Sequence, residues 1–425
     1  MLDLKLIREQ PDRVRQALAN RGLSFDLDGL LEKEIRLRRV TQELDRIRHE
    51  KRVASEEVGT LKRQGKSVDV LLQKLGGVSG QEDALSAQAA QLEAALREQL
   101  LLIPNIPHAS VPVGTGSPAN KVVSTWGEPR RFSFEPRTHL ELVESLRLID
   151  FERASKISGS HFVLFTGMGA RLERALINFM LDLHTKHHGY AELFPPHLVN
   201  RASMIGTGQL PKFEEDMYRL KEDDLFLVPT AEVPVTNIYA GELLEANKLP
   251  LYHTAFTACF RREAGSYGKE TKGLVRVHEF HKVELVKFTT PENSYDELEK
   301  LVRDAEEVLQ LLELPYRVVS LSTGDLGFSS AKTYDLEAHS AGTGVWLEVS
   351  SCSNFEDFQV RRANIRYRDP VTQKPRYVHT LNGSGVALAR TLIALLENHQ
   401  NADGTVTLPK ALRPYLDGLE RLTPA

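Results

Sequence analysis

Apolar residues in the first hundred positions recur with the seven-residue spacing of a coiled coil. From residue 30 onward they fall on two interleaved series, which are Leu30, Leu37, Leu44 and Val58 in the first, and Val40, Ile47, Ala54 and Leu61 in the second. A pattern kept over about four heptads predicts a long helix with an apolar seam. Lys33 and Lys51 stand at seam positions where an apolar side chain would pack better, so the seam is imperfect.

A polar turn interrupts this pattern at residues 64–67, whose sequence is Gln-Gly-Lys-Ser. The apolar spacing then resumes in alternating steps of three and four, with Glu82 in one slot, at Leu71, Leu75, Val78, Leu85, Ala89, Leu92 and Leu96. Two long helices separated by a short polar break fold back as an antiparallel hairpin. We therefore expect a hairpin over about residues 28–100, within an N-terminal domain of residues 1–110.

The pattern changes after a linker that is rich in proline, glycine and serine and runs from residue 103 to about 130. Helical periodicity follows at 171–183, 296–312 and 386–397, and alternating runs at 251–260, 274–288 and 346–350 predict strands. Helices scattered among long strands, without strict alternation, favour an α+β fold with an antiparallel sheet. This second domain would span residues 111–425.

Composition narrows the class of protein. The 425 residues contain no apolar run of 18 or more, so we expect no transmembrane helix. The N-terminal stretch is interrupted by Asp3 and Lys5 and reads as an amphipathic helix rather than a signal peptide. The two cysteines, Cys259 and Cys352, exclude a disulfide framework and a thiolate metal cage. These features predict a cytoplasmic protein.

The net charge of −4 excludes a uniformly basic nucleic-acid binder, but the charge is unevenly distributed. Residues 33–66 contain 11 Lys and Arg against 6 Asp and Glu. Residues 111–425 contain 36 against 41, so an acidic body is combined with a basic first helix of the hairpin. The charge therefore restricts a nucleic-acid partner to that helix.

Residues 257–288 form the segment richest in candidate chemistry. If a strand continues to Glu263, Arg261 and Glu263 share one face, because side chains alternate along a strand. A following strand would place on one face the set Arg276, His278, Phe280, Lys282 and Glu284. Arginines can clamp phosphates and a phenylalanine can stack on a base, so this hairpin could bind a planar, phosphorylated ligand. A solvated amphipathic hairpin with incidental ion pairs is the alternative.

Three histidines, His184, His187 and His188, lie close enough in sequence to suggest a metal site. They stand at the end of a predicted helix, just before Gly189. Positive charge is favourable at a helix C-terminus, so we interpret them as a helix-end cluster rather than as ligands.

Five segments resemble the motifs of the seryl-tRNA synthetases, a family of class II aminoacyl-tRNA synthetases. Residues 260–269 and 273–284 resemble the second class II motif, and Leu381–Arg390 resembles the third. The helix from Arg171, continuing through Gly189-Tyr190 to Pro196, would be the first motif. Residues 229–232 and 348–354 complete the set, and the N-terminal hairpin matches the tRNA-binding arm of bacterial-type members. The resemblance covers essentially the whole chain and implies the class II antiparallel sheet with flanking helices.

The resemblance also implies residue roles. Arg261 would contact the α-phosphate of ATP, Arg276 would reach the γ-phosphate, and Arg390 would lie across the adenine from the stacking Phe280. The full ATP-binding set would be Arg261, Arg262, Glu263, Val277, Phe280, Glu348, Val349, Ser350, Ser351 and Arg390. Glu348 and Ser351 would hold Mg²⁺. L-serine would be bound by Thr230, Ala231, Glu232, Glu284, Asn382 and Ser384.

The implied activity is ATP-dependent attachment of L-serine to tRNA(Ser) through a seryl-adenylate intermediate, with tRNA(Sec) as a further expected substrate. The arm would contact tRNA through Arg36, Arg39, Arg46 and Lys51, and a homodimer would form through the first motif. Three other classes of protein are the alternatives. A ligase that loads amino acids onto carrier proteins lacks the arm, and intact Arg261, Glu263, Glu348 and Arg390 argue against a catalytically inactive RNA-binding scaffold. A purely structural coiled-coil protein is excluded because the hairpin occupies only about a quarter of the chain.

At three places the sequence departs from the family's usual residues or from the alternation of a regular strand. Arg262 stands where the family usually has a small residue, and alternation along the strand points its side chain away from ATP. Glu348 and Ser351 are three residues apart and would lie on opposite faces of a regular strand, so we expect a bulge or a strand end between them. The loop at 338–346 lacks the sequence common in the family.

Overall fold

The computed structural model describes residues 1–264 and 273–424, and these divide into two compact units. One unit comprises residues 3–19 and 23–103, and the other comprises residues 1–2, 20–22 and 104–425. Part of the second class II motif, at 265–272, lies outside the described residues. The helical unit contains α1 (Leu4–Glu9), most of α2 (Pro11–Asn20), α3 (Leu27–Arg63) and α4 (Asp69–Leu100).

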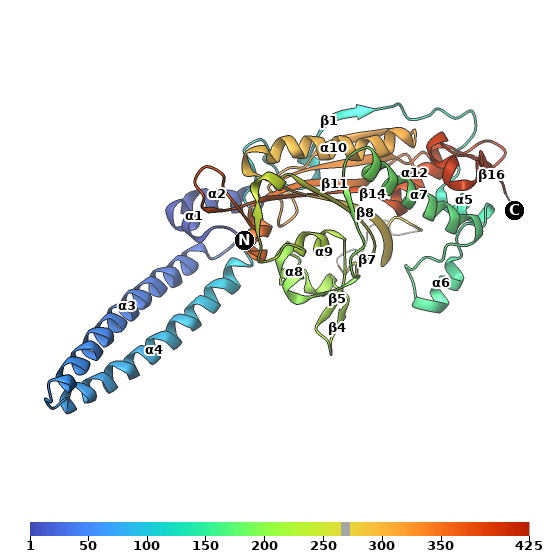
Figure 1. Cartoon of the computed structure of the whole chain (residues 1–425). Coiled ribbons are helices and arrows are strands. Elements are labelled where there is room, and N and C mark those ends of the chain that lie inside the picture. The colour runs from blue at the N-terminus through green and yellow to red at the C-terminus, as the bar shows by residue number, and fades with distance from the viewer. Residues whose placement is uncertain (265–272, 425) are drawn as a thin grey trace. The chain divides into compact units, whose positions relative to one another are not determined.

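The long helices α3 and α4 form the expected antiparallel hairpin (Figure 1). Every predicted apolar seam position is buried or half-buried, with Val40, Leu44 and Ile47 among the buried ones. The helix α3 ends where the polar turn was predicted, because Gly65 takes a positive φ of 69°. The hairpin is therefore held by the heptad seam read from the sequence.

The second unit is built on an eight-stranded sheet with the order β1-β9-β10-β11-β14-β8-β7-β2. All neighbouring strands are antiparallel except β2 and β7. The strands of this sheet are β1 (Lys121–Trp126), β2 (Ala191–Leu193), β7 (Leu251–Phe260), β8 (Glu279–Thr289), β9 (Tyr316–Ser320), β10 (Lys332–His339), β11 (Trp346–Glu356) and β14 (His379–Ala387). The predicted α+β class with an antiparallel sheet is confirmed.

Helices cover one face of this sheet and share a single core with it. The helices of this layer are α5 (His139–Ser145), α7 (Gly167–Lys186), α10 (Ser294–Leu311) and α12 (Leu388–Asn398), and the short helix α6 (Phe151–Ser158) follows α5 in the chain. Leu176, Leu301 and Leu392 pack in the same cluster as Val283 and Leu285 of β8. Because side chains alternate along β8, its even-numbered residues from 282 face the opposite side, where the candidate site lies.

Smaller elements cover that opposite side. They are β3 (Leu198–Asn200), α8 (Arg201–Thr207), β4 (Arg219–Leu220), β5 (Leu225–Leu227), α9 (Glu232–Asn237), β6 (Leu243–Glu245), α11 (Phe358–Ala363), β12 (Arg366–Arg368) and β13 (Pro375–Tyr377). A two-stranded ribbon, β15 (Val406–Thr407) and β16 (Arg421–Leu422), lies near the C-terminus. In Figure 1, α8 and α9 lie on the other side of the sheet from α10 and α12.

The prediction of strands at 261–263 and 274–278 is wrong. Strand β7 ends at Phe260. The Arg261 amide still donates to the His278 carbonyl oxygen at 2.9 Å, but the Arg262 amide donates to the Asp216 carbonyl oxygen at 2.9 Å and the Ala264 amide to the Asp216 carboxylate at 3.0 Å. Glu263 then takes a positive φ of 52°. Strand β8 begins only at Glu279. Before it, the Leu274 amide and the Val275 carbonyl oxygen bond to the His139 and Arg390 side chains, and the His278 amide donates to the His161 carbonyl oxygen at 2.9 Å.

The bulge expected between Glu348 and Ser351 is present. In the pairing of β10 with β11, Leu336 is opposite Ser350 and Glu337 is opposite Glu348, so Val349 is the extra residue. The bulge turns both Glu348 and Ser351 toward the same cavity.

No helix within residues 1–264 and 273–424 is long and apolar enough to span a membrane. Of the three histidines near the end of α7, His184 and His188 bind protein groups and His187 is exposed. His184 and His188 share a hydrogen bond between their Nδ1 atoms at 2.9 Å, and the Nε2 atoms contact the Gly385 carbonyl oxygen and Glu307 respectively. The described residues contain no cluster of three or more metal-ligating side chains.

Candidate active site

A cavity of about 320 Å³ opens between the sheet and the elements on its open face. Strands β8, β11 and β14 supply one wall, and the start of α12 lines the cavity as well. Fourteen predicted residues line it: Thr230, Glu232, Arg261, Glu263, Arg276, Val277, Phe280, Glu284, Glu348, Val349, Ser351, Asn382, Ser384 and Arg390. Residues far apart in sequence are thus brought to one site.

Three predicted residues do not line the cavity. Arg262 lies on the surface beside Tyr218 and His278, as its alternation with Arg261 suggested. The Ser350 hydroxyl turns the other way and donates to the Ser384 carbonyl oxygen at 2.7 Å. Ala231 is fully buried in an apolar cluster with Val235 and Val286.

Three arginines, Arg261, Arg276 and Arg390, line the cavity, and each is oriented by a protein partner. Arg276 donates from Nη1 to a Glu263 carboxylate oxygen at 3.0 Å. The Arg261 guanidinium lies 5.1 Å from the centre of the Phe280 ring, within the range of a cation–π contact. Three guanidinium groups held in this way form a preorganised site for an anion.

Arg390, in the first turn of α12, connects two walls of the cavity. Its Nε–H donates to the Val275 carbonyl oxygen at 3.3 Å, and its Nη1–H donates to the Glu348 carbonyl oxygen at 2.9 Å. The helix that positions this arginine is nearly all buried, so the guanidinium projects from a rigid element.

A second, acidic region of the cavity is deeply buried. The Thr230 hydroxyl donates to Glu284 Oε2 at 2.9 Å, and the Lys282 ammonium donates to the Thr230 hydroxyl at 2.9 Å and pairs with Glu284. Gln359 donates to Glu232 Oε1 at 2.6 Å. Burial, and next the nearby Glu284 charge, raise the pKa of Glu232 to about 7. This region can receive a small polar group that carries a positive charge.

Lys282 and Gln359 are site residues that the sequence interpretation did not assign. Lys282 was placed on the correct face of β8, but its pairing with Glu284 could not be read from one strand. Gln359 lies on α11 and carries no pattern signal, although its side chain bridges Glu232 and Thr380. The residues of the opposite wall, at 207–209 and 327–330, were also missed.

Family models match both parts of the chain. The seryl-tRNA synthetase N-terminal domain matches residues 1–107, and the class II tRNA synthetase core domain of the G, H, P, S and T enzymes matches residues 212–399. A serine–tRNA ligase of Carboxydothermus hydrogenoformans is 55% identical over 422 residues, which are 99% of each chain. Another, of Moorella thermoacetica, is 56% identical over 100% of this chain and 99% of that one. The chain belongs to the seryl-tRNA synthetase family.

Solved structures agree with this assignment. The seryl-tRNA synthetase of Pyrococcus horikoshii complexed with ATP has a TM-score of 0.93 at 39% identity and covers 100% of both chains. The cytoplasmic serine–tRNA ligase of Naegleria fowleri in complex with AMP has a TM-score of 0.88 at 28% identity, covering 100% of this chain and 99% of that one. The chain is thus a serine–tRNA ligase of class II.

The four basic residues predicted to contact tRNA differ in whether they already form ion pairs within the arm. Arg36 and Arg39 are exposed on α3 and form no ion pair within residues 1–264 and 273–424. Arg46 pairs with Glu43 and Glu50 of the same helix, and Lys51 pairs with Glu82 of α4 at 2.7 Å. Arg36 and Arg39 therefore have more of their charge available to a partner.

Proposed function

We propose that the cavity binds ATP and L-serine together and joins them as seryl-adenylate before transfer to tRNA(Ser). One observation supports this most directly: a cluster of three arginines and a buried acidic region with Glu232 and Glu284 line the same cavity. The arginines suit the triphosphate, and the acidic region suits the ammonium and hydroxyl groups of serine.

The first step needs no general base, because the serine carboxylate is already ionised at neutral pH. One carboxylate oxygen attacks the α-phosphorus of ATP, the bond to the bridging oxygen breaks, and pyrophosphate leaves with the electron pair. Arg261, Arg276 and Arg390 stabilise the charge that spreads over the phosphate oxygens. Catalysis then rests on positioning and electrostatic stabilisation.

The residues assigned to Mg²⁺ fit that ion. The bulge at Val349 places the Glu348 carboxylate and the Ser351 hydroxyl on the cavity wall, and both are oxygen donors. Mg²⁺ prefers oxygen ligands and is commonly held by one or two protein groups together with phosphates and water. When bound, the ion would neutralise phosphate charge, while Glu348 also holds Arg390 through its carbonyl oxygen.

Selection of serine depends on its hydroxyl group. If Glu284, Thr230 and Ser384 bind that hydroxyl in the buried region, alanine leaves these polar groups without a partner. The expected penalty is on the order of a few kcal/mol. Threonine differs by one methyl group, and shape alone can exclude it by only about 1–3 kcal/mol.

The second step transfers serine to a terminal ribose hydroxyl of tRNA, with AMP as the leaving group. The arm would hold tRNA(Ser) along α3, and tRNA(Sec) would be charged in the same way.

A homodimer would form through α7 and the chain leading to Pro196. Here β2 is an edge strand and Phe194 is 80% exposed, which supports an interface at this place. The cytoplasm is the expected compartment.

Serine-dependent exchange of pyrophosphate into ATP tests the first step. Glu284→Ala should abolish exchange while ATP affinity stays nearly unchanged, because the lost contacts lie in the acidic region. A matched control is Glu299→Ala, an exposed glutamate of α10 that does not line the cavity. Unchanged exchange in the Glu284 variant would refute the serine pocket.

Aminoacylation of total tRNA with labelled serine tests the second step. Deletion of residues 28–100 should prevent charging and leave pyrophosphate exchange intact. Charging that survives the deletion would refute the role of the arm.

A further inference from the structure

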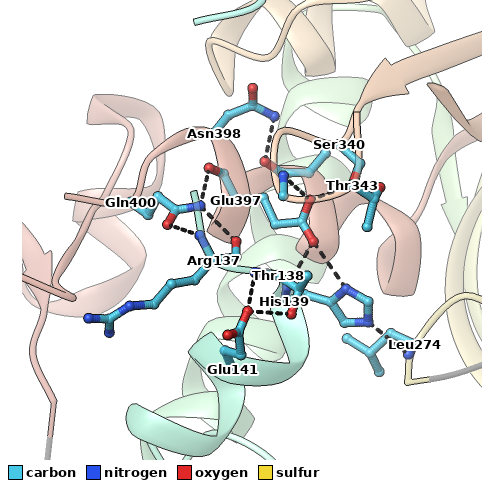
Figure 2. A network of polar contacts seen from close by, with 12 residues as sticks. Arg137, Thr138, His139, Glu141, Leu274, Ser340, Thr343, Glu397, Asn398 and Gln400 are labelled. Carbon is cyan, nitrogen blue, oxygen red and sulfur yellow. Dashed lines mark hydrogen bonds and ion pairs between the residues drawn. The ribbon is translucent and has the colours of Figure 1, made fainter. Parts of the chain in front are cut away.

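Glu397, near the end of α12, is a completely buried carboxylate that accepts hydrogen bonds from two other segments of the chain (Figure 2). Its Oε1 accepts from the His139 backbone amide at 2.8 Å and from His139 Nδ1 at 3.1 Å. Its Oε2 accepts from the Gly342 amide at 2.9 Å and from the Ser340 hydroxyl. All four partners are donors, so both oxygens must act as acceptors.

The hydrogen bonds of His139 determine which of its ring nitrogens carries the hydrogen. Nδ1 carries the hydrogen that is donated to Glu397, and Nε2 is then the acceptor nitrogen of a neutral ring. Nε2 accepts from the Leu274 backbone amide at 3.5 Å. One imidazole ring therefore connects the helix α12 to the backbone at Leu274, as Figure 2 shows.

The contact between His139 and this backbone is close. Gly273 has a φ of 67°, and a Cβ atom there would lie only 2.4 Å from His139 Nε2. No larger residue could stand at position 273 without moving the ring. The chain at Gly273 and Leu274 is thus set against His139.

The segment held in this way is a wall of the cavity. Leu274, Val275, Arg276 and Val277 all line it, and they precede the first residue of β8. No strand pairing supports them, in contrast to Phe280 and Glu284. Their position depends instead on side chains, namely His139 at Leu274 and Arg390 at Val275.

Arg390 and Glu397 belong to the same helix and lie about two turns apart, which places them on one side of it. The helix α12 therefore holds the wall at two adjacent residues. Arg390 does so directly, and Glu397 does so through His139. Loss of either link leaves the wall held to α12 at only one of these two residues.

We propose that His139 is a positioning residue for the ATP half of the site. By accepting the Leu274 amide it transmits the fixed position of α12 and Glu397 to the wall that would contact adenosine. The serine pocket is held separately, by the paired strands β8 and β14, so its affinity should not depend on this link. The inference rests on the proposed placement of ATP in the cavity.

Two substitutions test separately the hydrogen bonds of the two ring nitrogens of His139. In His139→Asn the side-chain amide can donate to Glu397 but is too short to reach Leu274. In His139→Gln an amide oxygen can reach the Leu274 amide; the side-chain hydrogen bond to Glu397 is lost, but the backbone amide of residue 139 still donates to Glu397. We expect His139→Asn to raise the KM for ATP about three- to tenfold, the effect of one lost hydrogen bond. His139→Gln should stay within about twofold of the parent enzyme, and the KM for serine should change in neither.

The matched control is His399→Asn, at the C-terminal end of the same helix. His399 is also largely buried, but its Nε2 contacts the Leu312 carbonyl oxygen and it does not line the cavity. This variant should lower the melting temperature and leave both KM values unchanged. Glu397→Gln is a second variant, because its amide group would face two donors; it should raise the KM for ATP even if His139→Asn does not fold.

The measurements are the KM values in pyrophosphate exchange, ATP affinity by calorimetry, and amide hydrogen exchange at Leu274–Val277. Faster amide hydrogen exchange at Leu274–Val277 and weaker ATP binding in His139→Asn, but not in His139→Gln, support the proposal. Equal effects of the two variants, a parallel rise in the KM for serine, or a fall in melting temperature without a change in ATP affinity would overturn it. Absence of serine-dependent exchange in the unaltered enzyme would instead refute the proposed function, and calorimetry and hydrogen exchange would still test the role of His139.

Discussion

Lys51 of α3 and Glu82 of α4 form an ion pair at 2.7 Å across the helical hairpin. Both residues occupy seam positions of the heptad pattern, where the sequence showed an imperfection in each helix. The structure shows that the two imperfections lie opposite each other. A polar pair at one level of a seam can fix the register of two helices at a cost in stability.

This pairing makes a prediction about the arm. Glu82→Leu alone should destabilise the hairpin, because Lys51 would lose its partner beside the seam. Lys51→Leu/Glu82→Leu should be at least as stable as the unaltered chain, because an apolar pair would continue the seam. Thermal unfolding followed by circular dichroism checks the order of the three proteins. A double variant less stable than the single one would show that the ion pair itself stabilises the hairpin.

The same ion pairs predict which arm residues contribute most to tRNA binding. Arg36→Ala and Arg39→Ala should each raise the KM for tRNA and reduce the salt dependence of binding by about one unit of slope per lost phosphate contact. Arg46→Ala should have a smaller effect, because Arg46 is already paired with Glu43 and Glu50. Charging assays at several salt concentrations measure this. An equal loss for all three variants would mean that the ion pairs open on binding.

Periodic patterns predicted the elements whose residues pack against regular neighbours. The seam of the hairpin, strand β7 at 251–260 and helix α10 followed from spacing alone, because burial on one face imposes that spacing. The bulge at Val349 followed from the need to bring Glu348 and Ser351 to one face. In each of these places, local pattern and tertiary packing agree.

The interpretation failed where side chains from distant segments decide the structure. Residues 274–278 alternate like a strand, yet the His139 and Arg390 side chains bind the Leu274 amide and the Val275 carbonyl oxygen, and no local signal announces this. Ala231 and Ser350 were assigned because they lie inside motifs, but alternation turns Ser350 away from the cavity. Gln359 and His139 belong to no motif, so only the fold reveals them.

Lys282 provides a prediction about the serine end of the cavity. Its ammonium group holds both Glu284 and the Thr230 hydroxyl, and it is nearly buried. Lys282→Met keeps the length of the side chain but leaves the Glu284 carboxylate buried without its cation, a change that costs about 3–5 kcal/mol in other proteins. We expect a strongly raised KM for serine and a lower melting temperature, with ATP affinity little changed. Equal loss of serine and ATP affinity would contradict this assignment.

The raised pKa of Glu232 predicts how serine binding depends on pH. Burial keeps its pKa at about 7 rather than at the ordinary value of 4.5, so the folded chain holds more protons than the unfolded chain between these values. This group therefore lowers the free energy of unfolding as the pH rises through that window. A substrate ammonium group near the carboxylate favours its ionised form, so serine binding releases a proton at pH below about 7.

The KM for serine should accordingly fall as the pH is raised from 6 to 8, with a slope that approaches about tenfold per pH unit on the acid side. Free serine keeps its ammonium group over this range, so the change must come from the protein. Glu232→Gln should bind serine more weakly and show a flat profile. Pyrophosphate exchange at saturating ATP measures both enzymes. A flat profile for the unaltered enzyme, or the same slope in the variant, would show that Glu232 is not the titrating group beside serine.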